Sequence, residues 1–119
     1  MKNLLVELFQ ERKIEAKNVE LVKFIKEYVD HLGYPDNSVG LIDDITEKIC
    51  DKDECFDDLK TNLDLDIRSN LKNSEDETLV MLKYKGKTVL EISCMPEYEE
   101  CSLKSISSDF FNEILKKYS

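Results

Sequence analysis

Acidic side chains are the most numerous groups in this sequence that could do chemistry, and their excess lies in its middle third. Residues 36–78 hold fourteen acids and five bases, so their net charge of −9 equals that of all 119 residues. Carboxylates at this density can bind metal ions, or the lysine and arginine side chains of a protein partner. The acids that we expect to point to solvent and bind a partner are Asp43, Asp44, Glu47, Asp51, Asp53, Glu54, Asp57, Asp58, Asp64 and Asp66.

A metal site is one alternative for these acids. The pattern of a calcium-binding loop fails from Asp51 and from Asn62, because neither frame places glycine at the sharp turn. The chain has only three glycines and no glycine-rich loop that could cradle a phosphate. We therefore expect no metal, no cofactor and no catalytic residue. A small metal-dependent hydrolase is kept as an alternative, and its candidate residues are Asp43, Glu47, Asp57 and Asp58.

The four cysteines are spaced too widely for a typical zinc site. Four residues separate Cys50 from Cys55 and six separate Cys94 from Cys101, whereas zinc pairs are usually tighter. The first ten residues contain no apolar run of the length found in signal peptides. We therefore expect a cytoplasmic protein with reduced thiols. A bridge between Cys94 and Cys101 is expected only in an oxidising compartment.

His31 is the single histidine, so catalysis by a Cys-His or Ser-His pair would have to use it. It precedes Gly33 at the expected end of a helix, where an imidazole interacts favourably with the helix C-terminus. No nucleophile can be identified as its partner. We therefore expect a structural role for His31 and a protein that is not an enzyme.

Alternating apolar and polar residues from 62 to 95 predict a three-stranded antiparallel meander. Apolar side chains at every second position from 63 to 67 indicate a first strand with one buried face. Gly86 separates the next two strands and can take the positive φ of a tight hairpin turn. The run from Leu79 to Leu82 is apolar on both faces, so we expect this middle strand to be covered on both sides. Pro96 is expected to end the third strand.

Helices are expected before the meander. Two apolar stripes in residues 4–32 point in different directions, which predicts two helices with a break near residues 13–17. Asn18 would cap the second of these helices, and Gly33 would end it. Further helices are predicted to start near Ser38 and at Asp53.

Two loops, one within the meander and one after it, and a last helix are also expected. Residues 69–77 are rich in polar and acidic side chains and predict a loop, and residues 97–100 predict a second acidic loop. Ser107 or Ser108 is expected to cap the last helix. The sequence thus predicts one α+β domain over residues 1–119, with N-terminal helices, the meander and a C-terminal helix.

The concentrated negative charge indicates how such a domain would act. It repels nucleic acid and anionic membranes, so we expect direct binding to neither, and it attracts a basic protein surface. In size and charge the chain resembles the small acidic inhibitors that phages and other mobile elements carry against restriction and CRISPR nucleases. This resemblance implies an inhibitor that imitates nucleic acid and occupies a basic, nucleic-acid-binding surface. An immunity protein that neutralises a toxin is a second alternative, and either would be a monomer or dimer.

Overall fold

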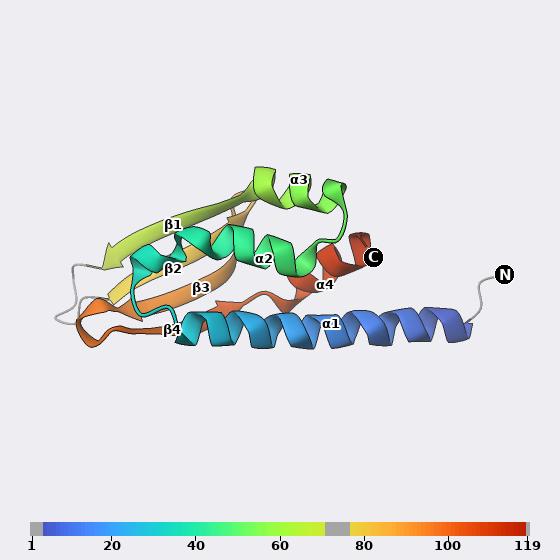
Figure 1. Cartoon of the computed structure of the whole chain (residues 1–119), viewed down its shortest axis with the longest axis horizontal. Coiled ribbons are helices and arrows are strands. Elements are labelled where there is room, and N and C mark those ends of the chain that lie inside the picture. Colours follow the sequence, from blue (N-terminus) through green and yellow to red (C-terminus); the bar gives the residue numbers. More distant parts are fainter. Residues whose placement is uncertain (1–3, 71–76, 119) are drawn as a thin grey trace.

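The computed structural model describes residues 4–70 and 77–118, which form an antiparallel sheet and helices around one core (Figure 1). The coarse prediction of an α+β fold is confirmed. No helix in these ranges is both long and apolar enough to cross a membrane. The elements are α1 (Leu4–Asp30), η1 (Pro35–Gly40), α2 (Leu41–Ile49), α3 (Asp53–Asn62), β1 (Leu63–Asn70), β2 (Glu77–Tyr84), β3 (Lys87–Met95), η2 (Pro96–Tyr98), β4 (Glu100–Ile106) and α4 (Ser108–Lys117).

The hairpin between β2 and β3 forms as the sequence predicts. Tyr84 pairs with Lys87, which leaves Lys85 and Gly86 as the two turn residues. Both have positive φ, at 50° and 82°, as expected for a two-residue turn that matches the twist of its strands. The β3 strand then ends at Met95, immediately before Pro96.

Replacing Gly86 with valine should lower the free energy of unfolding by about 1 kcal/mol or more, because a β-branched side chain disfavours positive φ. A Cβ atom at Gly86 would have no heavy atom within 4 Å. The loss of stability would therefore come from the backbone conformation and not from a steric clash. Lys87→Val is the control, since the exposed Lys87 begins a strand. Urea unfolding that gives equal stabilities for the two variants would contradict a positive-φ requirement at Gly86.

Only one face of the middle strand is packed against the helices. Thr78, Val80 and Leu82 are buried, whereas Leu79 and Met81 are half-buried. Val80 and Leu82 belong to the core that includes the helices, and Leu79 and Met81 do not. Within residues 4–70 and 77–118, the predicted cover of the second face is therefore not found, and cover by a second copy of the chain, the other alternative, stays a prediction. The second face is shielded instead by polar neighbours, since the cross-strand partners of Met81 are acidic residues of β1 and β3.

The prediction of three strands omitted β4, which pairs with β3 and makes the sheet four-stranded. Residue Glu100, expected in an acidic loop, is the first residue of this strand. The η2 turn and a positive φ of 54° at Glu99 reverse the chain after β3. The β3–β4 register shifts between Glu91 and Ile92, and such a bulge interrupts the alternation by which a strand is recognised.

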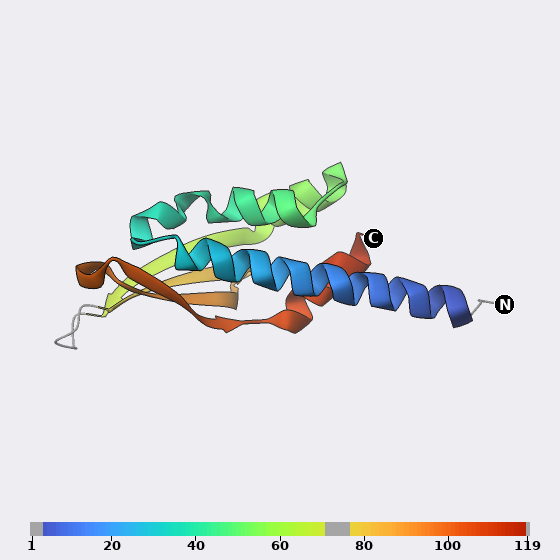
Figure 2. The same ribbon diagram turned by 60° about the horizontal axis from the view of Figure 1, so that its bottom comes forward.

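The prediction of a break in the first helical region is also wrong, because α1 is continuous. Ile14 and Asn18 are buried in line with Leu21, so the core stripe passes through the predicted break. Asn18 is therefore no cap, and its Nδ2 atom donates to the Ser108 carbonyl oxygen at 3.3 Å. Phe9, in the first of the two predicted stripes, is 67% exposed. The N-terminal part of α1 projects past the rest of the fold (Figures 1 and 2).

The remaining helix boundaries follow the predicted signals closely. Gly33 ends the first helical region with a φ of 73°, and η1 leads into α2. The α3 helix begins at Asp53 as predicted. Ser107 caps α4, since its side chain accepts a hydrogen bond from the Phe110 amide. Of the predicted loop 69–77, both ends belong to strands and residues 71–76 lie outside the described ranges.

The expectation of reduced thiols is wrong in this structure, because the four cysteines form two disulfides. Cys50 is bonded to Cys55, and Cys94 is bonded to Cys101. All four side chains are buried. The second pair spans directly opposite residues of β3 and β4, a relation that is hidden when β4 is not recognised.

Replacing Cys94 and Cys101 together with alanine should lower the free energy of unfolding by about 2 kcal/mol, as expected from the entropy of a short closed loop. Oxidised protein should react with no equivalent of a thiol reagent in denaturant. After reduction, all four cysteines should react. Detection of four thiols before reduction would restore the original prediction. The unfolding loss in the double variant should disappear when both proteins are measured in reductant.

Candidate functional site

The α2 and α3 helices carry most of the predicted partner-binding acids. They lie side by side in Figures 1 and 2, and the Cys50–Cys55 disulfide joins the end of α2 to the first turn of α3. Ile45 and Leu59 are fully buried, which fixes the inner side of each helix in the core. The polar side of the α2–α3 pair is consequently turned to solvent.

Seven of the ten predicted acids have exposed side chains. Among the described residues, none of the seven makes a hydrogen bond or an ion pair with another side chain. Their charges are therefore available to a partner. We call this group the acidic surface, and its members are Asp43, Glu47, Asp51, Asp53, Glu54, Asp57 and Asp64.

The other three predicted acids do not point freely to solvent, which corrects the expectation for Asp44, Asp58 and Asp66. All three are half-buried. Each has a partner within the chain, namely Tyr28 for Asp44, a cluster of side chains for Asp58, and Lys83 with Arg68 for Asp66. These carboxylates stabilise contacts between elements and are not part of the acidic surface.

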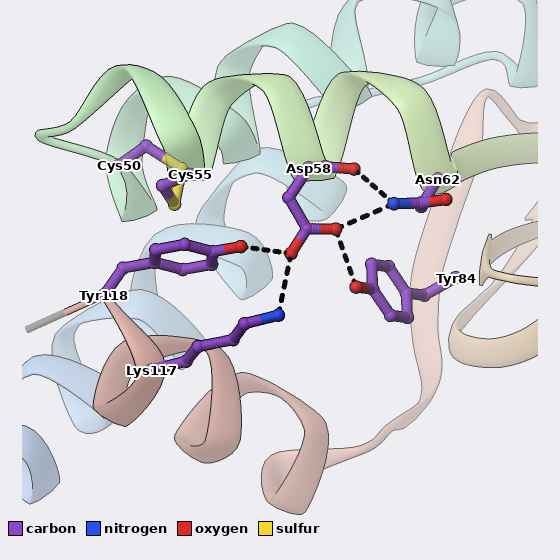
Figure 3. Close-up of polar contacts among 7 residues, drawn as sticks. All are labelled: Cys50, Cys55, Asp58, Asn62, Tyr84, Lys117 and Tyr118. Atoms are coloured by element: carbon purple, nitrogen blue, oxygen red, sulfur yellow. Dashed lines mark hydrogen bonds and ion pairs between the residues drawn. A yellow bond between two sulfur atoms is a disulfide. The ribbon is translucent and has the colours of Figure 1, made fainter.

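Asp58 is the centre of the largest polar cluster in the described part of the chain (Figure 3). Its side chain is 11% exposed. Its Oδ1 atom accepts hydrogen bonds from the Tyr84 hydroxyl at 2.7 Å and from Asn62 Nδ2 at 2.8 Å. Its Oδ2 atom accepts from the Tyr118 hydroxyl and lies 3.5 Å from Lys117 Nζ. One carboxylate thereby joins α3 to β2 and to the end of α4.

The partners of Asp58 change the ionisation of the whole cluster. Burial alone would raise the pKa of Asp58, but hydrogen bonds from Tyr118, Tyr84 and Asn62 outweigh it and lower that pKa to about 2. Burial, and then the hydrogen bond to Asp58, raise the pKa of Tyr84 to about 12. At neutral pH the cluster therefore holds an ionised carboxylate between two protonated phenols.

Asp66 and Asp44 interact with fewer side chains than Asp58 does. Asp66 Oδ2 lies 3.1 Å from both Lys83 Nζ and Arg68 Nε, and the hydrogen bond from Lys83 is the largest of the influences that lower its pKa. Burial and the hydrogen bond to Asp44 raise the pKa of Tyr28 to about 12.

The arrangement of the described side chains does not support the alternative of a metal-dependent hydrolase. Within residues 4–70 and 77–118, no three His, Cys, Asp or Glu side chains are grouped so that they could hold a metal ion. Asp58, one of the proposed ligands, is held by the cluster described above. His31 is exposed just past the end of α1, and its Nδ1 atom lies 2.8 Å from the Glu27 carbonyl oxygen, in agreement with a structural role.

The Asp58 cluster is the part of this region that the sequence did not predict. Asn62 follows Asp58 by one helical turn, and this spacing could have indicated their contact. Tyr84 and Tyr118 are 26 and 60 residues away from Asp58, and no local pattern links them. Charged and polar side chains thus supply the interactions that this region could make with a partner.

No protein-family model, curated protein or solved structure matches the chain.

Proposed function

We propose that this protein is an inhibitor that binds a basic, nucleic-acid-binding surface of another protein through its acidic surface. The observation that carries the proposal is the set of seven exposed carboxylates on α2, α3 and the adjoining residues, which have no side-chain partner among the residues that the structure describes. A solubilising coat would be expected to spread over the whole chain. Here the residues before 36 and after 78 are neutral in net charge.

The physical basis of the proposal is the match between carboxylates and phosphates. A nucleic-acid-binding surface presents lysine and arginine side chains to a row of negative charges. Carboxylates held on rigid helices can occupy the same cations, and their field accelerates the encounter. Such a protein needs no catalytic residue and no cofactor. Its anti-defence role, its phage or viral origin and a cytoplasmic location are parts of this proposal.

An immunity protein would use the same acidic surface against the basic cleft of a toxin. The identity of the captured partner separates this alternative from an inhibitor of a defence nuclease. The two disulfides count against the cytoplasmic part of this proposal, because disulfides persist mainly in oxidising compartments. A thiol count on protein purified from the cytoplasm, with thiols alkylated at lysis, tests that part of the proposal.

The experiment that tests the function is capture of a partner from host lysate on the immobilised protein, washed at low ionic strength. We expect a captured protein with a basic, nucleic-acid-binding surface, and we expect its release as salt rises from roughly 50 to 300 mM, because screening weakens contacts between exposed charges. Lysate treated with nuclease serves as the control against bridging by nucleic acid. Capture only of acidic or neutral proteins would contradict the proposal.

A further inference from the structure

A surface groove runs along the line where α1 packs beside α2. Three hollows of about 470, 380 and 360 Å³ adjoin there. The first and second share Phe24 and Tyr28 as lining residues, and the second and third share Glu47 and Lys48. We call this feature the α1–α2 groove. It includes part of the acidic surface, since Glu47 belongs to both.

Aromatic rings form the apolar part of the groove. Phe24 and Tyr28 are half-buried, and their ring centroids lie 6.1 Å apart with the planes inclined at 48°. Asp44 lines the groove beside the second ring. A rigid pair of rings with accessible edges or faces is a common anchor point for a partner side chain.

One of these rings already carries a cation. Lys48 Nζ lies 5.4 Å from the Phe24 ring centroid, within the range of a cation–π contact. Lys48 is itself exposed and forms no salt bridge with a described residue. The free protein therefore places its own ammonium group where a cation from outside could bind.

The charges around the rings favour such a cation. The groove is lined by five carboxylates. Two of these, Glu47 and Asp51, belong to the acidic surface and have no side-chain partner in the described part of the chain. The cationic lining residues are Lys17 and Lys48, so the negative charges outnumber the positive ones. A ligand that is planar, apolar on its faces and positively charged satisfies both the rings and the carboxylates.

We infer that the α1–α2 groove binds an arginine side chain of the protein partner. The guanidinium displaces Lys48 from the Phe24 ring, stacks on that ring and forms an ion pair with Glu47. This inference rests on the proposed function and names the contact through which the acidic surface recognises its target. Arginine fits better than lysine, because the guanidinium is planar, more weakly hydrated and able to stack while it pairs with a carboxylate.

The test uses a short arginine-glycine peptide and its lysine-glycine counterpart, with binding followed by NMR of the uniformly labelled protein. We expect the arginine peptide to shift the ring resonances of Phe24 and Tyr28 and to bind roughly fivefold more tightly than the lysine peptide. Phe24→Leu should weaken the arginine peptide roughly fivefold and bring the two peptides to similar affinity.

Lys48→Ala should change the affinity for the arginine peptide in the opposite direction to Phe24→Leu. Removal of the resident ammonium should tighten the arginine peptide by roughly threefold. Lys60→Ala removes the same charge from α3 outside the groove and is the matched control. The comparison is made at low salt, roughly 50 mM, and Lys60→Ala accounts for the long-range part of the charge change. Thermal unfolding of each variant confirms that it is folded.

The outcomes separate this inference from the proposed function. Unchanged peptide affinity in both Phe24→Leu and Lys48→Ala, with binding still lost on reversal of the acidic surface, would overturn the groove while the function stands. If neither peptide binds the unmodified protein at low salt although a basic partner is captured, the groove fails and the proposed function stands. If no such partner is captured either, both fail. Weakening in Phe24→Leu together with tightening in Lys48→Ala supports the inference.

Discussion

Asp58→Ala should lower the free energy of unfolding by about 3 kcal/mol, since it leaves two part-buried hydroxyls and a nearby lysine without their shared acceptor. The Tyr84 and Tyr118 hydroxyls both donate to this carboxylate. Asp57→Ala is the matched control, because Asp57 is the preceding residue of the same helix and is exposed. It should change the stability by less than about 0.5 kcal/mol. Urea unfolding of both variants measures the difference.

The contribution of Asp58 should also depend on pH. Its pKa is about 2 in the folded protein and 3.8 as a reference value. A lowered folded-state pKa gives stability that is fully present above pH 4 and is lost as pH falls toward 2, about 2 kcal/mol in all. The gap in stability between the unmodified protein and Asp58→Asn should therefore narrow over this range. A gap that stays constant from pH 5 to pH 2 would contradict the assigned ionisation.

The sequence predicted those parts of the fold that local patterns encode. The Gly86 turn, the start of α3 at Asp53 and the cap at Ser107 each depend on residues within a few positions of one another. Such signals act before tertiary packing is known. The α+β class followed from them.

The parts that could not be predicted depend on contacts between distant segments. Continuation of α1 through the expected break depends on the burial of Ile14 and on the bond from Asn18 to Ser108, 90 residues away. The pairing of β4 with β3 contains a register shift. Tertiary context outweighed the local signal in both cases.

The candidate site likewise has a part that local spacing predicts and a part that depends on distant contacts. An acid on the outer side of an amphipathic helix can be placed from its spacing, and Asp43 and Glu47 are exposed as predicted. Asp44 and Asp58 lie on the same helices but meet tyrosines of α1, β2 and the C-terminal end. Composition counts every carboxylate alike, so it could not separate the available charges from those that are already paired.

Reversal of the acidic surface should have the largest effect on function. Asp43→Lys with Glu47→Lys, or Asp57→Lys with Asp64→Lys, should weaken partner binding by on the order of 100-fold, because each pair replaces attraction by repulsion in a charged interface. The four side chains are exposed and lack side-chain partners among the described residues, so the fold should be retained. Binding is measured by titration with the captured partner, and the fold by thermal unfolding.

A matched control exists on α1. Glu11 and Glu15 are exposed and one helical turn apart, as are Asp43 and Glu47 on α2. Their reversal changes the net charge by the same amount outside the acidic surface, and it should weaken binding by less than about threefold. Equal losses for the α1 pair and the α2 pair would mean that binding responds to total charge and not to this surface.

Competition with nucleic acid is the most direct test of mimicry. A labelled oligonucleotide is bound to the captured partner, and its fluorescence anisotropy is followed as this protein is added. The account predicts that the unmodified protein releases the oligonucleotide completely, and that the Asp43→Lys, Glu47→Lys variant needs on the order of 100-fold more protein to do so. A ternary complex, in which protein and oligonucleotide are bound to the partner together, would contradict the claim that the acidic surface takes the place of nucleic acid.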